Sequence, residues 1–160
     1  MPASARFGRG RHESAASWVT MAESFALELP GGLRWVIEPP ADPCGDGYVR
    51  TALVGIQASG RQAHTIATFS DGPWNPARFF AELAADWRGW AGERRWRALE
   101  GEMEIEASHD GRGHVLVAVT VKRADMTFAP DAWSARIVFA LEADEQLAGV
   151  ARDLASVLAW

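Results

Sequence analysis

The sequence has few of the features that mark secreted, membrane-spanning or nucleic-acid-binding proteins. Its 160 residues include one cysteine, Cys44, which excludes an intramolecular disulfide and is typical of a reducing compartment, so we expect a cytoplasmic protein. No apolar run approaches the ~20 residues that a membrane-spanning helix needs, so we expect no membrane association. The net charge of −5 at pH 7 argues against general nucleic-acid binding, which needs a basic surface.

The sequence also lacks the short motifs that identify common enzymes. No serine lies in a nucleophile elbow, and no glycine-rich phosphate-binding loop is present. Cys44 has no neighbouring base in the sequence, and His64 is an isolated histidine in an expected strand. We therefore assign no catalytic residue, no cofactor and no metal ion to this chain.

Length and composition predict one folded domain preceded by an arm. Residues 1–20 combine arginines with small residues and contain no apolar run that could act as a signal sequence. We interpret them as a disordered arm, for which an over-extended gene start is one explanation. The chain is 48% hydrophobic and 23% charged, as ordinary globular proteins are, and residues 21–160 are long enough to enclose a core.

Alternating apolar residues predict strands in both halves of the chain. In the clearest hairpin, a loop at residues 30–32 pairs Leu29 with Leu33 and brings Glu28 opposite Arg34 on the other face. Further strands are expected at 48–57, 62–69, 115–121 and 133–141. One more strand is expected to begin after residue 95, and its alternation of apolar and polar residues is clear from residue 102 onward.

One helix is predicted before the most regular strands. Asn75 is a suitable N-cap and Pro76 a suitable first helical residue. The apolar stripe that follows includes Trp87 and Trp90, which we expect in the core, and the helix is expected to end at Gly92 or one turn earlier.

A second helix is predicted to begin near Asp144 and to close the chain. Its apolar stripe consists of Leu147, Val150, Ala151, Leu154, Val157 and Leu158. Together these elements predict an α+β domain in which a mostly antiparallel sheet of about seven strands carries two packed helices.

Two histidines, His109 and His114, lie at a strand-turn-strand with a spacing that suggests a metal site. The alternation predicts a three-residue loop at 111–113, which places His109 on the inner face beside Val115 and His114 on the outer face. Because zinc needs ligands that converge on one point, this register argues against a shared metal site.

A charged triplet, Glu93-Arg94-Arg95, lies between Trp90 and Trp96 and has two interpretations. The arginines could clamp a carboxylate or another planar anion. Alternatively, Glu93 holds the turn from helix to strand while the arginines cover the faces of the tryptophans.

Three glutamates, Glu102, Glu104 and Glu106, alternate along one strand and are expected on its outer face. The expected register places Lys122 opposite Glu102 and leaves the other two without a cation in their own hairpin. If this face is open, it attracts a basic protein; if a neighbouring strand or helix supplies cations, the row is purely structural.

The second half of the sequence contains a set of motifs that occur together in a known family. They are Phe79-Phe80-x-x-Leu83, Trp87-Arg88-Gly89-Trp90-x-Gly92-Glu93-Arg94-x-Trp96, His109-Asp110-x-x-Gly113-His114-Val115, Trp133, Glu145-Gln146-Leu147, Ala151 and Asp153-Leu154. On these motifs the sequence resembles a family of small, mainly actinobacterial proteins that is classed as a domain of unknown function. The resemblance covers roughly residues 75–158, while the first half matches only in strand pattern. Asp144-Glu145 stands where the family pattern has a Gly-Glu pair. The resemblance implies a bacterial protein but no activity, substrate or cofactor.

These observations lead to two hypotheses about function. The first is a non-enzymatic protein-binding module, such as an immunity-type or regulatory partner, that uses the face carrying Glu104 and Glu106. The second is a small-molecule-binding protein or an enzyme with a tryptophan-lined pocket between helix and sheet, closed by Arg94, Arg95 and His109. A cavity with converging polar groups at that place supports the second hypothesis, whereas a filled core supports the first. The identity of any partner and the oligomeric state stay open.

Overall fold

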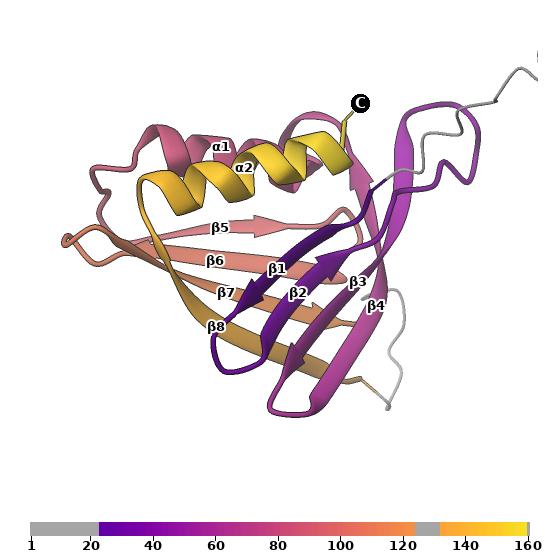
Figure 1. The fold of residues 1–160 in the computed structure, drawn as a ribbon. Coiled ribbons are helices and arrows are strands. Elements are labelled where there is room, and N and C mark those ends of the chain that lie inside the picture. Colours follow the sequence, from indigo (N-terminus) through magenta and orange to yellow (C-terminus); the bar gives the residue numbers. More distant parts are fainter. Residues whose placement is uncertain (1–22, 124–131, 160) are drawn as a thin grey trace, which may run out of the picture.

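A computed structural model describes residues 23–123 and 132–159 of the chain. The predicted arm, residues 1–20, lies outside the described residues. The helices are α1 (Pro76–Ala85) and α2 (Glu145–Val157), with a short 3₁₀ helix, η1 (Gly72–Trp74), before α1 (Figure 1). The strands are β1 (Phe25–Leu29), β2 (Leu33–Ile37), β3 (Val49–Ala58), β4 (Arg61–Ser70), β5 (Glu93–Arg97), β6 (Met103–His109), β7 (His114–Lys122) and β8 (Ser134–Glu142).

The strands form two antiparallel sheets of four strands each. The first has the order β1-β2-β3-β4 and the second the order β5-β6-β7-β8. The α+β class is therefore confirmed, but the prediction of one sheet of about seven strands is wrong. The additional strand arises from a turn at residues 99–102, where Gly101 has a φ of 77° and the chain folds back on itself. The segment expected as one strand after Arg95 is thus the β5–β6 hairpin.

The register of the first hairpin agrees with the prediction on both faces. Leu29 pairs with Leu33, and Glu28 lies opposite Arg34. The Nε atom of Arg34 is 3.1 Å from Oε1 of Glu28, so the expected cross-strand ion pair is present. Apolar residues on one face and opposite charges on the other specify the same pairing, which leaves no competing register.

Two other turns fix the registers of the β6–β7 and β3–β4 hairpins. In β6–β7, His109 pairs with Val115 as predicted, and Gly113 has the left-handed φ of 96° that the turn requires. The β3–β4 register, which the sequence leaves ambiguous, follows from the two-residue turn Ser59-Gly60. Both of its residues have positive φ, the conformation that suits the twist of a two-residue hairpin.

Both helices begin where their capping residues predict. The Oδ1 atom of Asn75 accepts a hydrogen bond from the N–H of Ala77 at 2.9 Å, and Pro76 occupies the first helical position. The Asp144 carboxylate accepts one from the N–H of Glu145 at 2.6 Å. In the described ranges, neither helix has the length and apolar character that crossing a membrane requires.

Helix α1 ends earlier than predicted. Its last residue is Ala85, so Trp87 and Trp90 belong to the connection between α1 and β5. Gly89 has a φ of 132°, which few residues other than glycine adopt, and its N–H donates to the carbonyl of Asp86 at 2.8 Å. This turn breaks the helix although the apolar spacing continues through it.

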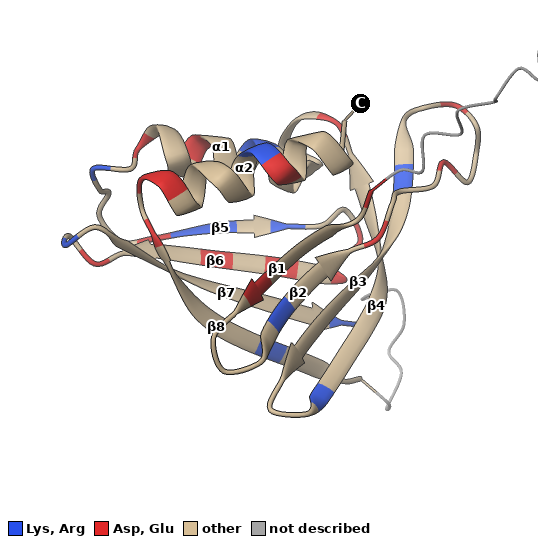
Figure 2. Cartoon of the chain, in the orientation of Figure 1, with Lys and Arg blue, Asp and Glu red and all other residues tan. Residues whose placement is uncertain are grey.

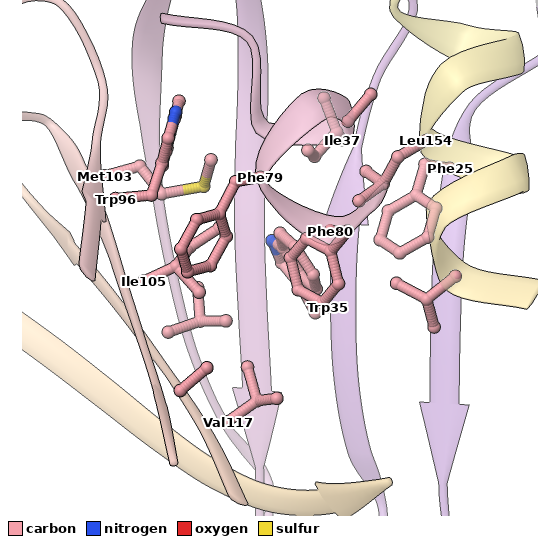
Figure 3. Packing of buried hydrophobic residues seen from close by; sticks show 14 of the residues in the cluster. Phe25, Trp35, Ile37, Phe79, Phe80, Trp96, Met103, Ile105, Val117 and Leu154 are labelled. Atoms are coloured by element: carbon pink, nitrogen blue, oxygen red, sulfur yellow. The ribbon is translucent and has the colours of Figure 1, made fainter. Parts of the chain in front are cut away.

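One hydrophobic core lies between the two sheets and the two helices (Figures 1 and 3). Helices α1 and α2 lie side by side over it. Trp35 of β2 contacts Phe25 edge-on at 4.9 Å between ring centroids and Phe80 of α1 at 5.7 Å. Phe69 of β4 stacks on Trp96 of β5 at 6.2 Å. Rings from distant parts of the chain therefore share one core, in which each buried aromatic contact adds about 0.5–1.5 kcal/mol beyond its area.

The two sheets meet at one corner, where β4 approaches the turn between β5 and β6. The N–H of Leu99 donates to the carbonyl of Thr68 at 3.0 Å, and the Thr68 hydroxyl donates to Oε1 of Glu102 at 2.7 Å. Glu102 is only 2% exposed, so at this position the expected outer row of glutamates is not open to solvent: its carboxylate lies against Thr68 of β4. Among the described residues, its buried Oε2 has no hydrogen-bond partner.

Candidate functional site

The connection between α1 and β5 brings together two of the predicted site residues, Arg94 and His109. Both lie against Trp90: the Arg94 guanidinium carbon is 4.8 Å from the ring centroid, and the His109 ring meets it edge-on at 5.3 Å. Arg94 also forms an ion pair with Asp86, with 2.7 Å between Nη2 and Oδ2. Arg94 thus covers a tryptophan face, as one of the two interpretations predicted.

Both ring nitrogens of His109 are occupied by backbone groups. The N–H of Gly111 donates to Nδ1 at 2.9 Å, so Nε2 carries the proton and donates to the carbonyl of Trp87 at 3.0 Å. His114 lies on the other face of the hairpin, where its Nδ1 is 3.0 Å from Oδ2 of Asp110. The His109 ring therefore fixes the turn after α1 and offers no free nitrogen for proton transfer.

The interior of the protein beneath α1 is filled by the protein's own side chains. Phe79 and Phe80 of α1 are buried there (Figure 3), as is Leu83 of the same helix. Trp87, which we expected in this core, is 45% exposed, because α1 ends before it. Its ring contacts the Arg88 guanidinium at 5.0 Å instead. Hydrophobic packing thus occupies the interior beneath α1. The groove of about 370 Å³ that lies between α1 and β5 is lined, among the described residues, by no tryptophan but by Pro73, Arg78, Phe79, Glu82 and Arg95.

The predicted glutamates Glu104 and Glu106 alternate with buried residues of β6, so they lie on the outer face of the second sheet. In Figure 2, acidic positions on β6 adjoin basic positions on β5. The Nζ atom of Lys122 is 3.0 Å from Oε1 of Glu104, and Nη2 of Arg136 is 2.6 Å from Oε2 of Glu106. Lys122 therefore neutralises Glu104 instead of Glu102. The expectation that Glu104 lacks a cation in its own hairpin is wrong, and the cation nearest to Glu106 comes from β8.

Arg95 lies on this same outer face, between two carboxylates. Its Nε atom donates to Oε1 of Glu93 at 2.5 Å, and its Nη2 atom is 3.5 Å from Oε1 of Glu106. The hydrogen bond with Glu93, followed by the charges of Glu93 and Glu106, raises the pKa of Arg95 above its ordinary value. Successive residues of a strand point to opposite faces. The predicted residues therefore form two groups on opposite sides of the sheet: Arg94 with His109, and Arg95 with Glu104 and Glu106.

The outer face of the first sheet carries an apolar stripe, formed by Val36, Leu53 and Ile66, that the sequence analysis did not single out. Val36, Gly55 and His64 lie side by side across β2, β3 and β4, and Leu53 pairs with Ile66 in the next row. Leu53 is 40% exposed and Ile66 is 56% exposed. Outward residues of a sheet that borders water are usually polar, so this stripe departs from the common pattern.

A hollow of about 150 Å³ opens over Gly55, where the stripe has no side chain. Val36, Leu53 and Ile56 contribute apolar surface to its lining. Polar groups surround it, contributed by Arg34, Glu38, Gln57, Gln62 and His64. The stripe and the hollow together form a small apolar depression with a polar rim.

Comparison with known proteins relates this chain to a protein family. The model of a family of unknown function (DUF6228) matches residues 39–160. The chain belongs to this family. No curated protein and no solved structure matches the chain.

The DUF6228 match confirms the predicted resemblance and extends it toward the N-terminus. It includes β3 and β4, which supply the larger part of the lining of the hollow over Gly55, whereas β1 and β2 precede it. A signal for the apolar stripe is present in the sequence: Leu53 directly precedes Val54, and Ile66 directly precedes Ala67. In each pair, one residue faces the core and the other must face outward.

Proposed function

We propose that this protein is a non-enzymatic protein-binding module that binds its partner through the outer face of the first sheet. The observation that carries the proposal is the apolar stripe of Val36, Leu53 and Ile66 beside the hollow over Gly55. Exposed aliphatic side chains that adjoin one another inside a polar rim are typical of protein-binding surfaces. The hollow accepts an aliphatic side chain of the partner, which serves as the anchor of the interface.

The rim of the hollow supports this interpretation. An apolar centre surrounded by polar and charged groups is the usual arrangement of an interface between proteins. Arg34 of β2 and Glu38, which directly follows this strand, supply opposite charges, while Gln57, Gln62 and His64 supply hydrogen-bonding groups. Such rim groups contribute mainly to specificity and to the rate of association.

The second sheet is a weaker choice for this partner. The charges of Glu104 and Glu106 are balanced by Lys122, Arg95 and Arg136, so little attraction for a basic protein is left. The filled core likewise gives no support to the small-molecule hypothesis. We therefore infer that a protein partner binds to the outer face of the first sheet and not to the face that carries Glu104 and Glu106.

A module of this kind acts by occupying a surface of its partner, as an immunity-type or regulatory protein does. We place it in the bacterial cytoplasm, since Cys44, the single cysteine of the chain, suits a reducing compartment.

The substitution Gly55→Val tests the proposal. Gly55 has an ordinary strand conformation, and an added Cβ would meet only the carbonyl oxygen of Ala63, at 3.9 Å. Valine also favours strands, so the variant should fold with unchanged or higher stability. Because the new side chain fills the hollow, affinity for the partner should fall by at least about tenfold, or about 1.4 kcal/mol.

Photocrosslinking in the source cells identifies the partner and supplies the control. A photoreactive residue at Ile66 should capture a partner protein, whereas one at Val138 on the second sheet should not, although the two sites are similarly exposed at 56% and 51%. The Ile66 crosslink should disappear in Gly55→Val and persist in Ala140→Val, which adds methyl groups to the second sheet. Capture from Val138 alone, or full binding by Gly55→Val, would contradict the proposal.

A further inference from the structure

The hydrogen bonds of β5 reveal which of its backbone groups are free. In an antiparallel pair, opposed residues alternate between those that exchange backbone hydrogen bonds and those that do not. The N–H of Ala98 donates to the carbonyl of Met103 at 2.8 Å, and these residues continue the β5–β6 register. The N–H of Lys122 donates to the carbonyl of Glu102 at 2.9 Å, so the even-numbered residues of β6 bond to β7 and the odd-numbered ones to β5. Both observations therefore indicate that the even-numbered residues of β5 form the backbone hydrogen bonds with β6.

The backbone groups of Glu93 and Arg95 therefore point away from β6, toward the free edge of the sheet. Leu99, the odd-numbered residue just beyond β5, shows the same direction, since its N–H reaches the carbonyl of Thr68 in the other sheet. Within residues 23–123 and 132–159, no hydrogen bond to the N–H of Glu93 or Arg95 is present. The edge thus presents donors and acceptors that an added strand could use.

A groove of about 370 Å³ lies between this free edge and α1. Pro73 and Phe79 give it apolar surface, and Arg78, Glu82 and Arg95 give it charged walls. Its volume falls within the range of 300–1,000 Å³ that is common for binding sites. An extended chain that lies beside β5 would run along this groove.

On the outer face of the second sheet, the edge strand β5 is basic and its neighbour β6 is acidic (Figure 2). Arg95 and Arg97 lie on β5, and Glu104 and Glu106 on β6. The next strands, β7 and β8, carry the cations Lys122 and Arg136. The five residues of β5 include three arginines and one glutamate, a net charge of +2 in a chain of net charge −5. Since opposite charges on adjacent strands stabilise a sheet, a strand that pairs with the basic edge strand β5 is best acidic.

We propose that an extended acidic segment of a partner protein binds in this groove as an added strand of the second sheet. Its backbone bonds to the free groups of Glu93 and Arg95. Acidic side chains on one face of the segment lie beside Arg95, and apolar side chains on the other face contact Phe79 and Pro73. In such strand addition, main-chain bonds provide affinity and alternate side chains provide specificity. This site is distinct from the apolar stripe and does not depend on the function proposed for it.

The substitution Arg95→Pro tests the site through the backbone. Its N–H points into the groove, so proline removes a donor that only the added strand uses, and edge strands tolerate proline at such positions. Arg95→Ala is the matched control, because it removes the side chain and keeps the donor. The probe is a phage-displayed library of random peptides selected on the full-length chain.

Selected peptides should alternate acidic and apolar residues and should bind wild type and Gly55→Val equally. Arg95→Pro should weaken binding by about tenfold, as expected for one lost main-chain hydrogen bond, and Arg95→Ala by less. Hydrogen exchange at the amides of Glu93 and Arg95 should slow when peptide binds to the wild type. Because hydrogen exchange is measured on the wild type, it tests whether a strand adds to β5 even if the proline variant does not fold.

Three results would overturn the inference. The first is full binding by a folded Arg95→Pro variant. The second is unchanged exchange at the amides of Glu93 and Arg95 while peptide is bound. The third is self-association that Arg95→Pro abolishes, since this would identify the occupant of the edge as a second copy of the chain.

Discussion

The corner where the two sheets meet permits a sharp test of the packing. The Thr68 hydroxyl donates to Oε1 of Glu102 at 2.7 Å, and this carboxyl group is almost completely buried. We predict that Thr68→Val, which keeps the shape of the side chain and removes the donor, destabilises the protein. The backbone bond from Leu99 to the Thr68 carbonyl stays possible in the variant, so the change isolates the side-chain contact.

The size of the expected loss in the free energy of unfolding follows from the burial of Glu102. One of its oxygens, Oε2, has no hydrogen-bond partner among the described residues, and the substitution leaves the other oxygen unpaired as well. Leaving a buried polar group without its partner costs roughly 1–3 kcal/mol. In a domain of this size, each kcal/mol lowers Tm by about 2–4 °C, so we expect a fall of roughly 2–12 °C.

The double variant Thr68→Val with Glu102→Met supplies the control. When both partners become apolar, no buried polar atom is left unpaired, so its stability should return to the wild-type value or exceed it. Urea unfolding followed by tryptophan fluorescence measures both variants. If Thr68→Val alone leaves the free energy of unfolding unchanged, Glu102 reaches water and the buried corner is incorrect.

Two further predictions concern single side chains. Trp35→Ala should cost about 3–5 kcal/mol because the ring is fully buried, whereas Trp87→Ala should change stability by less than about 1 kcal/mol, and urea unfolding distinguishes the two. The backbone N–H groups of His114 and Arg112 lower the pKa of Asp110 from 3.8 to about 2. These bonds stabilise the turn above pH 3.8 and are lost as the pH falls through about 2, so Asp110→Asn should reduce the pH dependence of the unfolding midpoint in this interval.

The local elements could be predicted from the sequence wherever two independent signals agree. In the first hairpin, the apolar alternation and the pair Glu28–Arg34 specify one register. At the start of α1, two signals mark the same helix end: the Asn75 side chain accepts a hydrogen bond from a backbone N–H, and Pro76 occupies the first helical position. The end of α1 could not be predicted in this way, because the apolar spacing continues through Trp87 while the conformation of Gly89 breaks the helix.

The arrangement of the sheets depends on contacts that no local pattern contains. Alternation placed Glu102, Glu104 and Glu106 on the outer side of their sheet, and it could not show what lies beside each of them. Glu102 meets Thr68 of the other sheet, and the cation of Glu106 that lies closest comes from Arg136 of β8. Since both partners are distant in sequence, the environment of these glutamates follows from the tertiary structure alone.

The two proposed binding surfaces lie where substitutions need not disturb the core, and this separates binding from stability. Gly55 faces outward from β3, and the N–H of Arg95 faces outward from the edge of β5. The corner at Thr68 differs from these two positions because it connects both proposed surfaces. Its backbone hydrogen bond links β4, which carries Ile66, to the chain that follows β5. If the sheets unfold as one unit around their shared core, Thr68→Val should weaken both binding activities only in proportion to the unfolded fraction. A variant that lost one activity while fully folded would show instead that the corner positions that surface directly.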